Sequence, residues 1–314
     1  MMSALRVRLF GAFEASLNNQ PIPRLNGKAQ ELFCYLLLHR DQPNPREKLA
    51  GLLWERAPAA RSRKYLRDTL WQLHTALHCG QKLASKRLLG IAGDDVRAPS
   101  GLWLDVAEFE QAFTAPARGP LGEAAVRRIQ QAVALYRGDL LEGYSQRWCV
   151  EERERLQCMY LVMLEQLMTC CEARGEYEAG LCYGAAALRC DAADERAHRR
   201  MMWLHWLAGD RAGALRQYAW CAKALKDELE ASPSAETNRL YDQIRAGSPV
   251  AARSGSAAVP LAPTHTLADR VHELRTMLGK LENELRQRDR ARTPTSSRKS
   301  SFLRKRLTPE ATSV

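Results

Sequence analysis

Residues 61–79, RSRKYLRDTLWQLHTALHC, decide how the first third of the chain is expected to fold. Four leucines recur at helical spacing and form one continuous apolar edge: Leu66, Leu70, Leu73 and Leu77. The side chains opposite that edge are Lys64, Arg67, Trp71 and Thr75, with Arg63 and His74 on its flank and Arg61 at the helix start. The segment therefore predicts an amphipathic helix that packs through its leucines and exposes a basic face.

The residues before this helix predict a small sheet followed by two shorter helices. Residues 5–22 alternate apolar and polar side chains around a pair of asparagines, which is typical of two strands joined by a turn. The apolar residues then fall at helical spacing up to His39. A second short helix is expected to start within residues 43–47, with Pro45 in its first turn, and to end at Trp54.

The residues after the basic helix return to a strand pattern. Residues 83–105 contain several short apolar runs, and the turn Gly93-Asp94-Asp95 between two of them predicts a hairpin. A sheet, two helices, a basic third helix and a hairpin, in that order, are the layout of a winged helix. In that fold the third helix enters the major groove of DNA while the flanking elements hold phosphates.

The middle of the chain, residues 121–246, is helical in pattern and contains a repeat. GEYEAGL at 175–181 is followed 34 residues later by GDRAGAL at 209–215. A 34-residue period with a glycine between two helical halves is typical of tetratricopeptide repeats, which stack into a solenoid. Three tryptophans of this region are expected to be packing anchors rather than a cofactor cage: Trp203, Trp206 and Trp220.

The end of the chain is expected to be a flexible basic tail with one helix in it. Residues 247–266 have the Gly, Ser, Pro and Ala composition of a linker. Residues 267–290 carry leucine or valine at heptad spacing, which fits either a weak coiled coil or a lone amphipathic helix. Residues 291–314 are rich in Ser, Thr, Arg and Lys, a composition typical of disorder.

The distribution of charge favours a polyanionic partner at the two ends of the chain. The net charge of the 314 residues is +11, made up of +5 in residues 1–114, −1 in residues 115–247 and +7 in residues 248–314. Ordinary solubility charge explains the same composition, so the charge alone leaves both interpretations open.

The cysteines and the apolar runs predict a cytoplasmic protein that does not cross a membrane. The nine cysteines are an odd number without a C-x-x-C pair, as expected of reduced thiols. The longest uncharged runs are too short for a transmembrane helix, and the first residues contain no apolar signal segment.

The motifs of common enzymes are missing from the sequence. There is no phosphate-binding G-x-x-x-x-G-K-[ST] loop and no G-x-G-x-x-G turn, and the seven histidines have no zinc-ligand spacing with the cysteines. We therefore expect no catalytic residue, no cofactor site, no metal site and no enzymatic activity.

Several motifs resemble those of SARP-like bacterial transcription activators. The leucine-rich run from Leu66 to Leu77 resembles the third helix of their OmpR-type winged helices. The segment YRGDLLEG at 136–143 is similar to the opening motif of the bacterial transcriptional activator domain. Further matches follow this segment: Trp148, Glu151, Arg153, Arg155, Leu156, Asp194-Glu195 and Pro233. The resemblance covers roughly residues 1–246, although His74 stands where a second arginine is common in the family.

The resemblance implies a mainly α fold with a small β component and three parts. These are an OmpR-type winged helix at 1–114, a tetratricopeptide-like bacterial transcriptional activator domain at 115–247, and the tail at 248–314. It implies a sequence-specific DNA-binding regulator, an activator that recruits RNA polymerase. It also implies a homodimer whose repeat domain binds a ligand or protein of unknown identity.

The DNA-binding face would comprise the residues opposite and beside the leucine edge: Arg61, Arg63, Lys64, Arg67, Trp71, His74 and Thr75. In the resembled family the loop between the second and third helices faces RNA polymerase, and here that loop would contain Arg56, Ala57, Pro58, Ala59 and Ala60. The alternative is a helical-repeat protein-interaction or scaffold module whose winged helix does not bind DNA.

Overall fold

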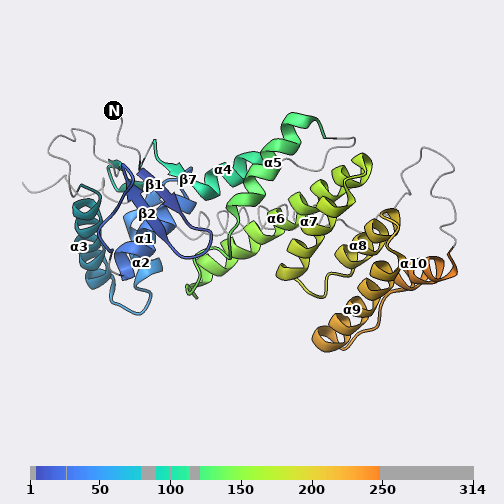
Figure 1. The fold of residues 1–314 in the computed structure, drawn as a ribbon. Helices are drawn as coiled ribbons and strands as arrows, with labels where there is room; N and C mark the ends of the chain where they lie inside the picture. Colours follow the sequence, from blue (N-terminus) through green and yellow to red (C-terminus); the bar gives the residue numbers. More distant parts are fainter. Residues whose placement is uncertain (1–4, 26, 79–89, 100, 114–120, 248–314) are drawn as a thin grey trace, which may run out of the picture. The chain divides into compact units, whose positions relative to one another are not determined.

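The computed structural model describes residues 5–25, 27–78, 90–99, 101–113 and 121–247, and it is mainly α with a small β component (Figure 1). This confirms the predicted fold class. The tail at 248–314, including the heptad helix predicted at 267–290, lies outside the described residues.

The N-terminal sheet contains four strands in the order β3-β2-β1-β7. Strand β1 pairs antiparallel with β2 and parallel with β7, and β2 pairs antiparallel with β3. Asn18 and Asn19 join β2 to β3 with φ values of 53° and 64°, left-handed conformations that asparagine tolerates well. The strands have these bounds: β1 Leu5–Arg8, β2 Glu14–Leu17, β3 Gln20–Pro21 and β7 Trp103–Leu104.

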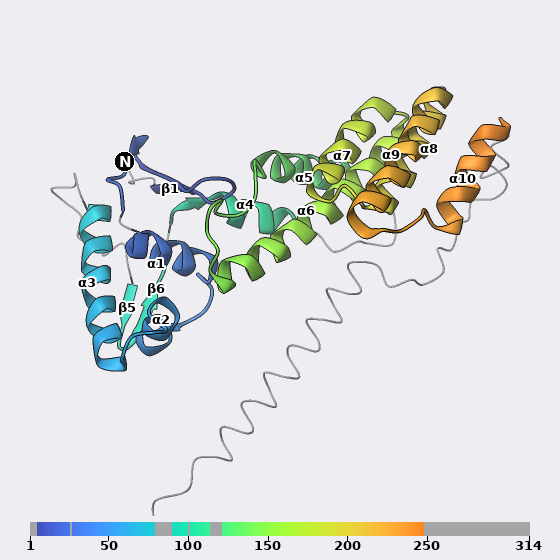
Figure 2. The same cartoon turned by 90° about the horizontal axis from the view of Figure 1, so that it is seen from below.

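Three helices and a hairpin follow β3 in the chain, in the predicted order, and lie together (Figure 2). The hairpin strands β5 and β6 pair antiparallel, and β6 also pairs with β4, a two-residue strand that the sequence did not predict. Pro45 lies in β4 and precedes the second helix instead of occupying its first turn. The bounds are α1 Gly27–Leu38, β4 Asn44–Pro45, α2 Arg46–Leu53, α3 Ala59–His78, β5 Gly90–Ala92 and β6 Asp95–Arg97.

The core of this part is built around α1, which is buried on nearly all sides. Nine of its twelve residues are buried, among them Phe33, Leu36 and Leu37. The leucine edge of α3 packs into the same core, and its four members are at most 7% exposed. Burying a leucine side chain contributes about 1.5–3 kcal/mol, so these four residues fix the face that α3 turns outward.

The rest of the described chain is helical. Helices α6 and α7 pack as one antiparallel pair and α8 and α9 as another, with Gly175 (φ 73°) and Gly209 (φ 80°) at the two turns. These glycines confirm the 34-residue period, because both turns need a left-handed residue. Helix α4 was not predicted. The bounds are α4 Asp105–Ala112, α5 Glu123–Leu135, α6 Arg147–Arg174, α7 Tyr177–Cys190, α8 Glu195–Leu207, α9 Arg211–Leu229 and α10 Ala235–Ala246.

The segment that connects α5 to α6 is hydrogen-bonded to the residues that follow β1. Phe10 and Leu140 form an antiparallel bridge, and three backbone hydrogen bonds of 2.8–3.0 Å join residues 9–11 to residues 139–142. The guanidinium of Arg153 holds the same segment from α6, donating to the carbonyls of Leu140, Leu141 and Tyr144 at 2.9–3.2 Å. The YRGDLLEG motif therefore joins the winged helix to the helical part.

Aromatic rings and a buried carboxylate complete this junction. The Phe10 ring lies 5.0 Å from Phe109 and 4.8 Å from Tyr136, and Tyr136 stacks on Tyr160 at 4.1 Å. The carboxylate of Asp105 accepts from the amides of Leu9 and Phe10 at 2.9–3.0 Å. Burial raises the pKa of Asp105 above its usual range, although these amide hydrogen bonds oppose the shift.

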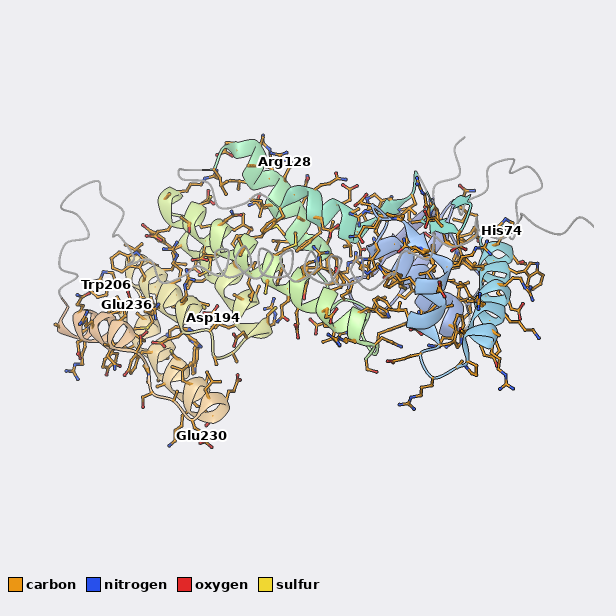
Figure 3. The ribbon with its side chains drawn as sticks, turned by 180° about the vertical axis from the view of Figure 1, so that it is seen from behind. His74, Arg128, Asp194, Trp206, Glu230 and Glu236 are labelled. Atoms are coloured by element: carbon orange, nitrogen blue, oxygen red, sulfur yellow. The ribbon has the colours of Figure 1, made fainter. Side chains whose placement is uncertain are left out.

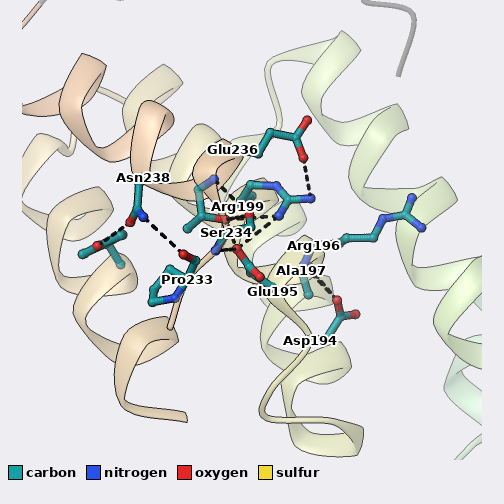
Figure 4. A network of polar contacts seen from close by, with 11 residues as sticks. Asp194, Glu195, Arg196, Ala197, Arg199, Pro233, Ser234, Glu236 and Asn238 are labelled. Atoms are coloured by element: carbon teal, nitrogen blue, oxygen red, sulfur yellow. Dashed lines mark hydrogen bonds and ion pairs between the residues drawn. The ribbon is translucent and has the colours of Figure 1, made fainter. Parts of the chain in front are cut away.

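A polar network fastens the last helix, α10, to α8 (Figure 4). Glu195 in the first turn of α8 accepts from the Ser234 amide at 2.8 Å, from the Thr237 hydroxyl, and pairs with Arg199 at 3.5 Å. Asp194 caps the N-terminus of α8 by accepting from the amides of Arg196 and Ala197. Both acids are therefore structural. Asp194 caps the N-terminus of α8, and Glu195 binds the start of α10.

Candidate nucleic-acid interface

The start of α3 is locally unfavourable for a helix, which marks it as a candidate site. Its first turn carries no acidic residue, whereas Arg61 lies in that turn and Arg63 and Lys64 follow in the next. The N-terminus of a helix is the positive end of its dipole, where a cation costs about 0.3–1 kcal/mol. Positions that lower stability without a packing reason are often functional.

All seven residues predicted on the DNA-binding face are exposed. The Trp71 side chain is 68% exposed, an unusual state for so large an apolar ring. Arg61 and Arg63 are two residues apart, so they lie at opposite edges of the exposed side of the helix, with Lys64 between them. The structure therefore brings the predicted residues onto one solvent-facing surface, the α3 outer face: Arg61, Arg63, Lys64, Arg67, Trp71, His74 and Thr75. His74 is labelled near the end of α3 in Figure 3.

The cations of the α3 outer face are held only weakly by other protein groups. Arg67 has a long, exposed ion pair of 3.9 Å with Asp68, the next residue along the helix. Arg63 donates to the Ala59 carbonyl at 3.3 Å. Within the described part of the chain, no acidic side chain pairs with Arg61 or Lys64. The acid at Asp68 was not considered in the sequence analysis, and it lowers the positive potential of this face locally.

The hydroxyl of Thr75 is partly engaged by the helix itself. Its Oγ1 donates to the Trp71 carbonyl at 2.9 Å, which leaves the oxygen as an acceptor. A side chain in this state is a poor donor to phosphate. Thr75 therefore offers the face its methyl group and an acceptor.

The hairpin of β5 and β6 is held to the start of α2 at its turn. The amide of Arg46 in α2 donates to the Asp94 carbonyl at 3.0 Å, and Gly93 supplies the positive φ of 63° that the turn requires. Val96 of β6 is fully buried, whereas Arg97, the next residue, is exposed. Arg97 is a candidate wing contact that the sequence analysis did not single out.

The segment between α2 and α3 is shorter than predicted. Ala59 and Ala60 were expected in a loop but form the first turn of α3, because the amides of Arg61 and Ser62 bond to the Pro58 carbonyl. The loop predicted to contact RNA polymerase is therefore reduced to Arg56, Ala57 and Pro58, beside Trp54. The Trp54 ring lies 5.9 Å from the Tyr65 ring of α3, so the residue after α2 packs beside α3.

The arginines of α8 differ from those of α3 because all of them are paired. Arg196 pairs with Glu165 at 2.9 Å, Arg199 with Glu236 at 3.3 Å, and Arg200 with Glu172 at 3.0 Å. Trp203 donates through Nε1 to Glu172 at 2.9 Å. These contacts join α8 to α6 and α10, so they stabilise the repeat.

The three tryptophans predicted as packing anchors divide into two groups. Trp203 and Trp206 are half-buried, and Trp206 packs on the cluster of Met202, Ala214 and Ile244. Trp220 was predicted to pack in the same way, but it is 58% exposed on α9. That prediction was wrong because the buried face of α9 is set by Ala214, Gln217, Cys221 and Leu225, which turns Trp220 outward.

Among the residues that the structure describes, no cluster of three metal-binding side chains occurs. In the same residues, no helix is both long enough and apolar enough to span a bilayer.

Comparisons with known proteins place this geometry in context. Residues 104–245 match the family described as the bacterial transcriptional activator domain. Among solved structures, the chain is similar to Mycobacterium tuberculosis EmbR in complex with a low-affinity phosphopeptide, with a TM-score of 0.66 and 20% sequence identity. The alignment covers 79% of this chain and 67% of that chain, and at this identity it shows a shared fold. A comparison with curated protein sequences found no match.

Proposed function

We propose that this chain, whose residues 104–245 match the bacterial transcriptional activator domain, is a SARP-like transcriptional regulator that binds double-stranded DNA through the α3 outer face. Its function would be that of a sequence-specific transcription activator in the cytoplasm. The observation that carries the proposal is the set of exposed cations at the start of α3 without strong acidic partners.

The residues of the α3 outer face have distinct proposed roles. Arg67 is the first candidate for a base or phosphate contact, because its partner Asp68 is exposed and the pair is long. Lys64 and Arg61 suit phosphates, and Trp71 suits a sugar or a thymine methyl group. Arg97 on the wing would hold the backbone beside the groove.

The test is the salt dependence of duplex DNA binding by the full chain. Binding through several phosphates should weaken with a log–log slope of about −0.9 per phosphate. Lys64→Ala and Arg67→Ala should each weaken binding, with a slope reduced by about one wherever a phosphate contact is lost. Arg128→Ala is the matched control, since Arg128 on α5 is exposed and removes the same charge far along the chain from α3 (Figure 3).

Each outcome of this test has a clear meaning. If Lys64→Ala and Arg67→Ala bind as tightly as Arg128→Ala at moderate salt, α3 is not the DNA-binding helix. If the wild-type chain shows no salt-dependent binding, the alternative of a protein-interaction module is correct. In that case the exposed Trp220 is the first surface to test for a protein partner.

RNA polymerase is the proposed second partner, contacted by Arg56, Ala57 and Pro58. These residues lie between two packed helices, and Arg56 and Pro58 are exposed. Arg56→Ala should bind DNA normally but lower transcription in a reconstituted assay with RNA polymerase. Full activation by this variant would remove the loop from the proposal.

A homodimer is the proposed active form, because one winged helix buries little area and two on neighbouring half-sites gain avidity. The heptad positions of the tail offer one route to it. Leu274→Asp with Leu281→Asp would replace two leucines of the heptad pattern predicted at 267–290 without removing a positive residue. Unchanged dimerisation and unchanged DNA affinity in that double variant would leave the tail only an electrostatic role.

A further inference from the structure

We infer that Glu110 of α4 couples the DNA-binding part of the chain to the helical repeat, by holding one arginine from each part on a single carboxylate. The inference rests on the proposed function, since it concerns how DNA binding at α3 is communicated to α6. We call Arg40, Glu110, Glu152 and Arg155 the Glu110 latch.

The geometry of the latch is specific. Arg40 Nη2 lies 2.5 Å from Glu110 Oε2, and Arg155 Nη2 lies 2.5 Å from Glu110 Oε1. The second acid, Glu152, pairs with Arg155 at 2.7 Å. The four side chains are 18–29% exposed, so solvent screens them less than an ordinary surface pair.

The charges of the latch alternate and cancel. Two guanidiniums face two carboxylates, so removing one carboxylate leaves a partly buried arginine without full compensation. Burial would lower the pKa of Arg155, but its hydrogen bonds to Glu152 and Glu110 outweigh that effect and raise it. The latch therefore favours one arrangement of its three helical elements.

One side of the latch leads to the DNA-binding helix. Arg40 lies two residues after the end of α1, and its Nη1 donates to the Leu37 carbonyl at 3.4 Å, which ties the guanidinium to the end of α1. Helix α1 packs against α3. The backbone bridge at Phe10 and Leu140 joins the helical part to the sheet strand β1, whereas the latch joins it to α1.

The other side of the latch leads to the repeat. Arg155 lies in the third turn of α6, a helix that continues unbroken to Arg174. Glu172 in its last turn accepts from Trp203 and pairs with Arg200, both of α8. Helix α6 thus carries the latch near its start and the contacts to α8, the first helix of the second pair, at its end.

The experiment measures amide hydrogen exchange with and without a duplex that the wild-type chain retains from a random-sequence library. In the wild-type chain, DNA should slow exchange in α3 and also, by about fivefold, at residues 150–158 of α6. In Glu110→Gln the protection of α3 should persist, while the slowing at 150–158 should fall to less than about twofold. The ratio with and without DNA is taken within each variant, so a general loss of stability cancels.

The chain offers a matched control and a second variant. Glu108→Gln makes the same charge change on the same helix at an exposed residue outside the latch, and should behave as the wild type. Arg155→Gln keeps the pair of Arg40 and Glu110 and removes only the α6 side, so it should also lose the slowing at 150–158. It replaces Glu110→Gln if that variant fails to fold.

The outcomes separate the inference from the proposed function. Equal slowing at 150–158 in Glu110→Gln and the wild type, or protection of α3 without any slowing there in the wild type, overturns the coupling by Glu110. Failure of the wild-type chain to retain any duplex, or to protect α3, contradicts the proposed function itself.

Discussion

Helices α3 and α8 both carry closely spaced cations, but they use them in opposite ways. In α8 each arginine pairs with an acid, on α6 for Arg196 and Arg200 and on α8 and α10 for Arg199. In α3 the ion pair of Arg67 is to its own neighbour Asp68, at 3.9 Å. A run of arginines therefore does not by itself define a nucleic-acid surface. The arginines remain available to a ligand only where the neighbouring helices supply no carboxylates to pair with them.

The helix ends show the same contrast. Helix α8 starts with an Asp194 cap and Glu195 in its first turn, which suits the positive end of its dipole. Helix α3 has no acid in its first turn and carries Arg61 there. We therefore expect changes in α8 to alter stability and changes in α3 to alter binding.

The largest expected effect is on stability, at Glu195. Glu195→Ala leaves the Ser234 amide, the Thr237 hydroxyl and Arg199 without their shared acceptor. The free energy of unfolding should fall by about 2–3 kcal/mol, measured by urea denaturation. Glu228→Ala, an exposed acid of α9, is the control and should change it by less than about 0.5 kcal/mol.

The second expected effect has opposite signs for binding and stability. Arg61→Glu places an acid in the first turn of α3, so the free energy of unfolding should rise by about 0.5 kcal/mol. DNA binding should weaken by about tenfold or more, since the cation that we propose faces a phosphate becomes an anion. Filter binding and thermal denaturation on one sample measure both. A variant that loses stability along with affinity would show that Arg61 is structural, as the α8 arginines are.

The third effect concerns pH and belongs to α8. Burial alone would raise the pKa of Glu195, but hydrogen bonds from Ser234 and Thr237 and the charge of Arg199 outweigh it and hold the pKa below its usual range. The ionised carboxylate therefore stabilises the fold above its unfolded-state pKa of about 4.3, and this contribution is lost as pH falls through the folded-state value. The stability difference between wild type and Glu195→Gln should shrink over that acidic range. A difference that stays constant from pH 6 to pH 3 would mean that the carboxylate charge is irrelevant.

The smallest effect is expected at Arg196, the most exposed arginine of α8. Its pair with Glu165 has side chains that are 42% and 54% exposed, and such pairs contribute about 0–1 kcal/mol. Arg196→Ala should change the free energy of unfolding by less than about 1 kcal/mol and leave DNA affinity unaltered. A clear loss of DNA affinity would extend the binding surface to α8 and break the comparison.

Local features of the fold could be predicted from the sequence. The leucine edge of α3, the asparagine turn between β2 and β3, and the two glycine turns of the repeat each depend on residues close together in the chain. The buried leucines also determine which side of α3 faces solvent. Each residue of the α3 outer face could therefore be predicted from its position relative to them.

Features that depend on distant partners could not be predicted. Asp105 bonds to amides 95 and 96 residues away, and its neighbours in the sequence give no sign of this. Strand β4 contains two residues, too few for any periodicity. The prediction that Trp220 packs inside the repeat was wrong, because the way α9 packs against its neighbours decides which apolar residues of α9 are buried.

Helix α6 is unbroken from Arg147 to Arg174, which limits the insertions and deletions that related chains could carry within it. Each residue inserted between Arg155 and Glu172 would turn everything beyond it by about 100° and advance it by about 1.5 Å. One added residue would rotate the repeat about the helix axis by about 100°, whereas seven added residues would leave its orientation within about 20° of the original. Related chains should therefore differ in the length of this helix only by numbers of residues that complete nearly whole turns, such as seven.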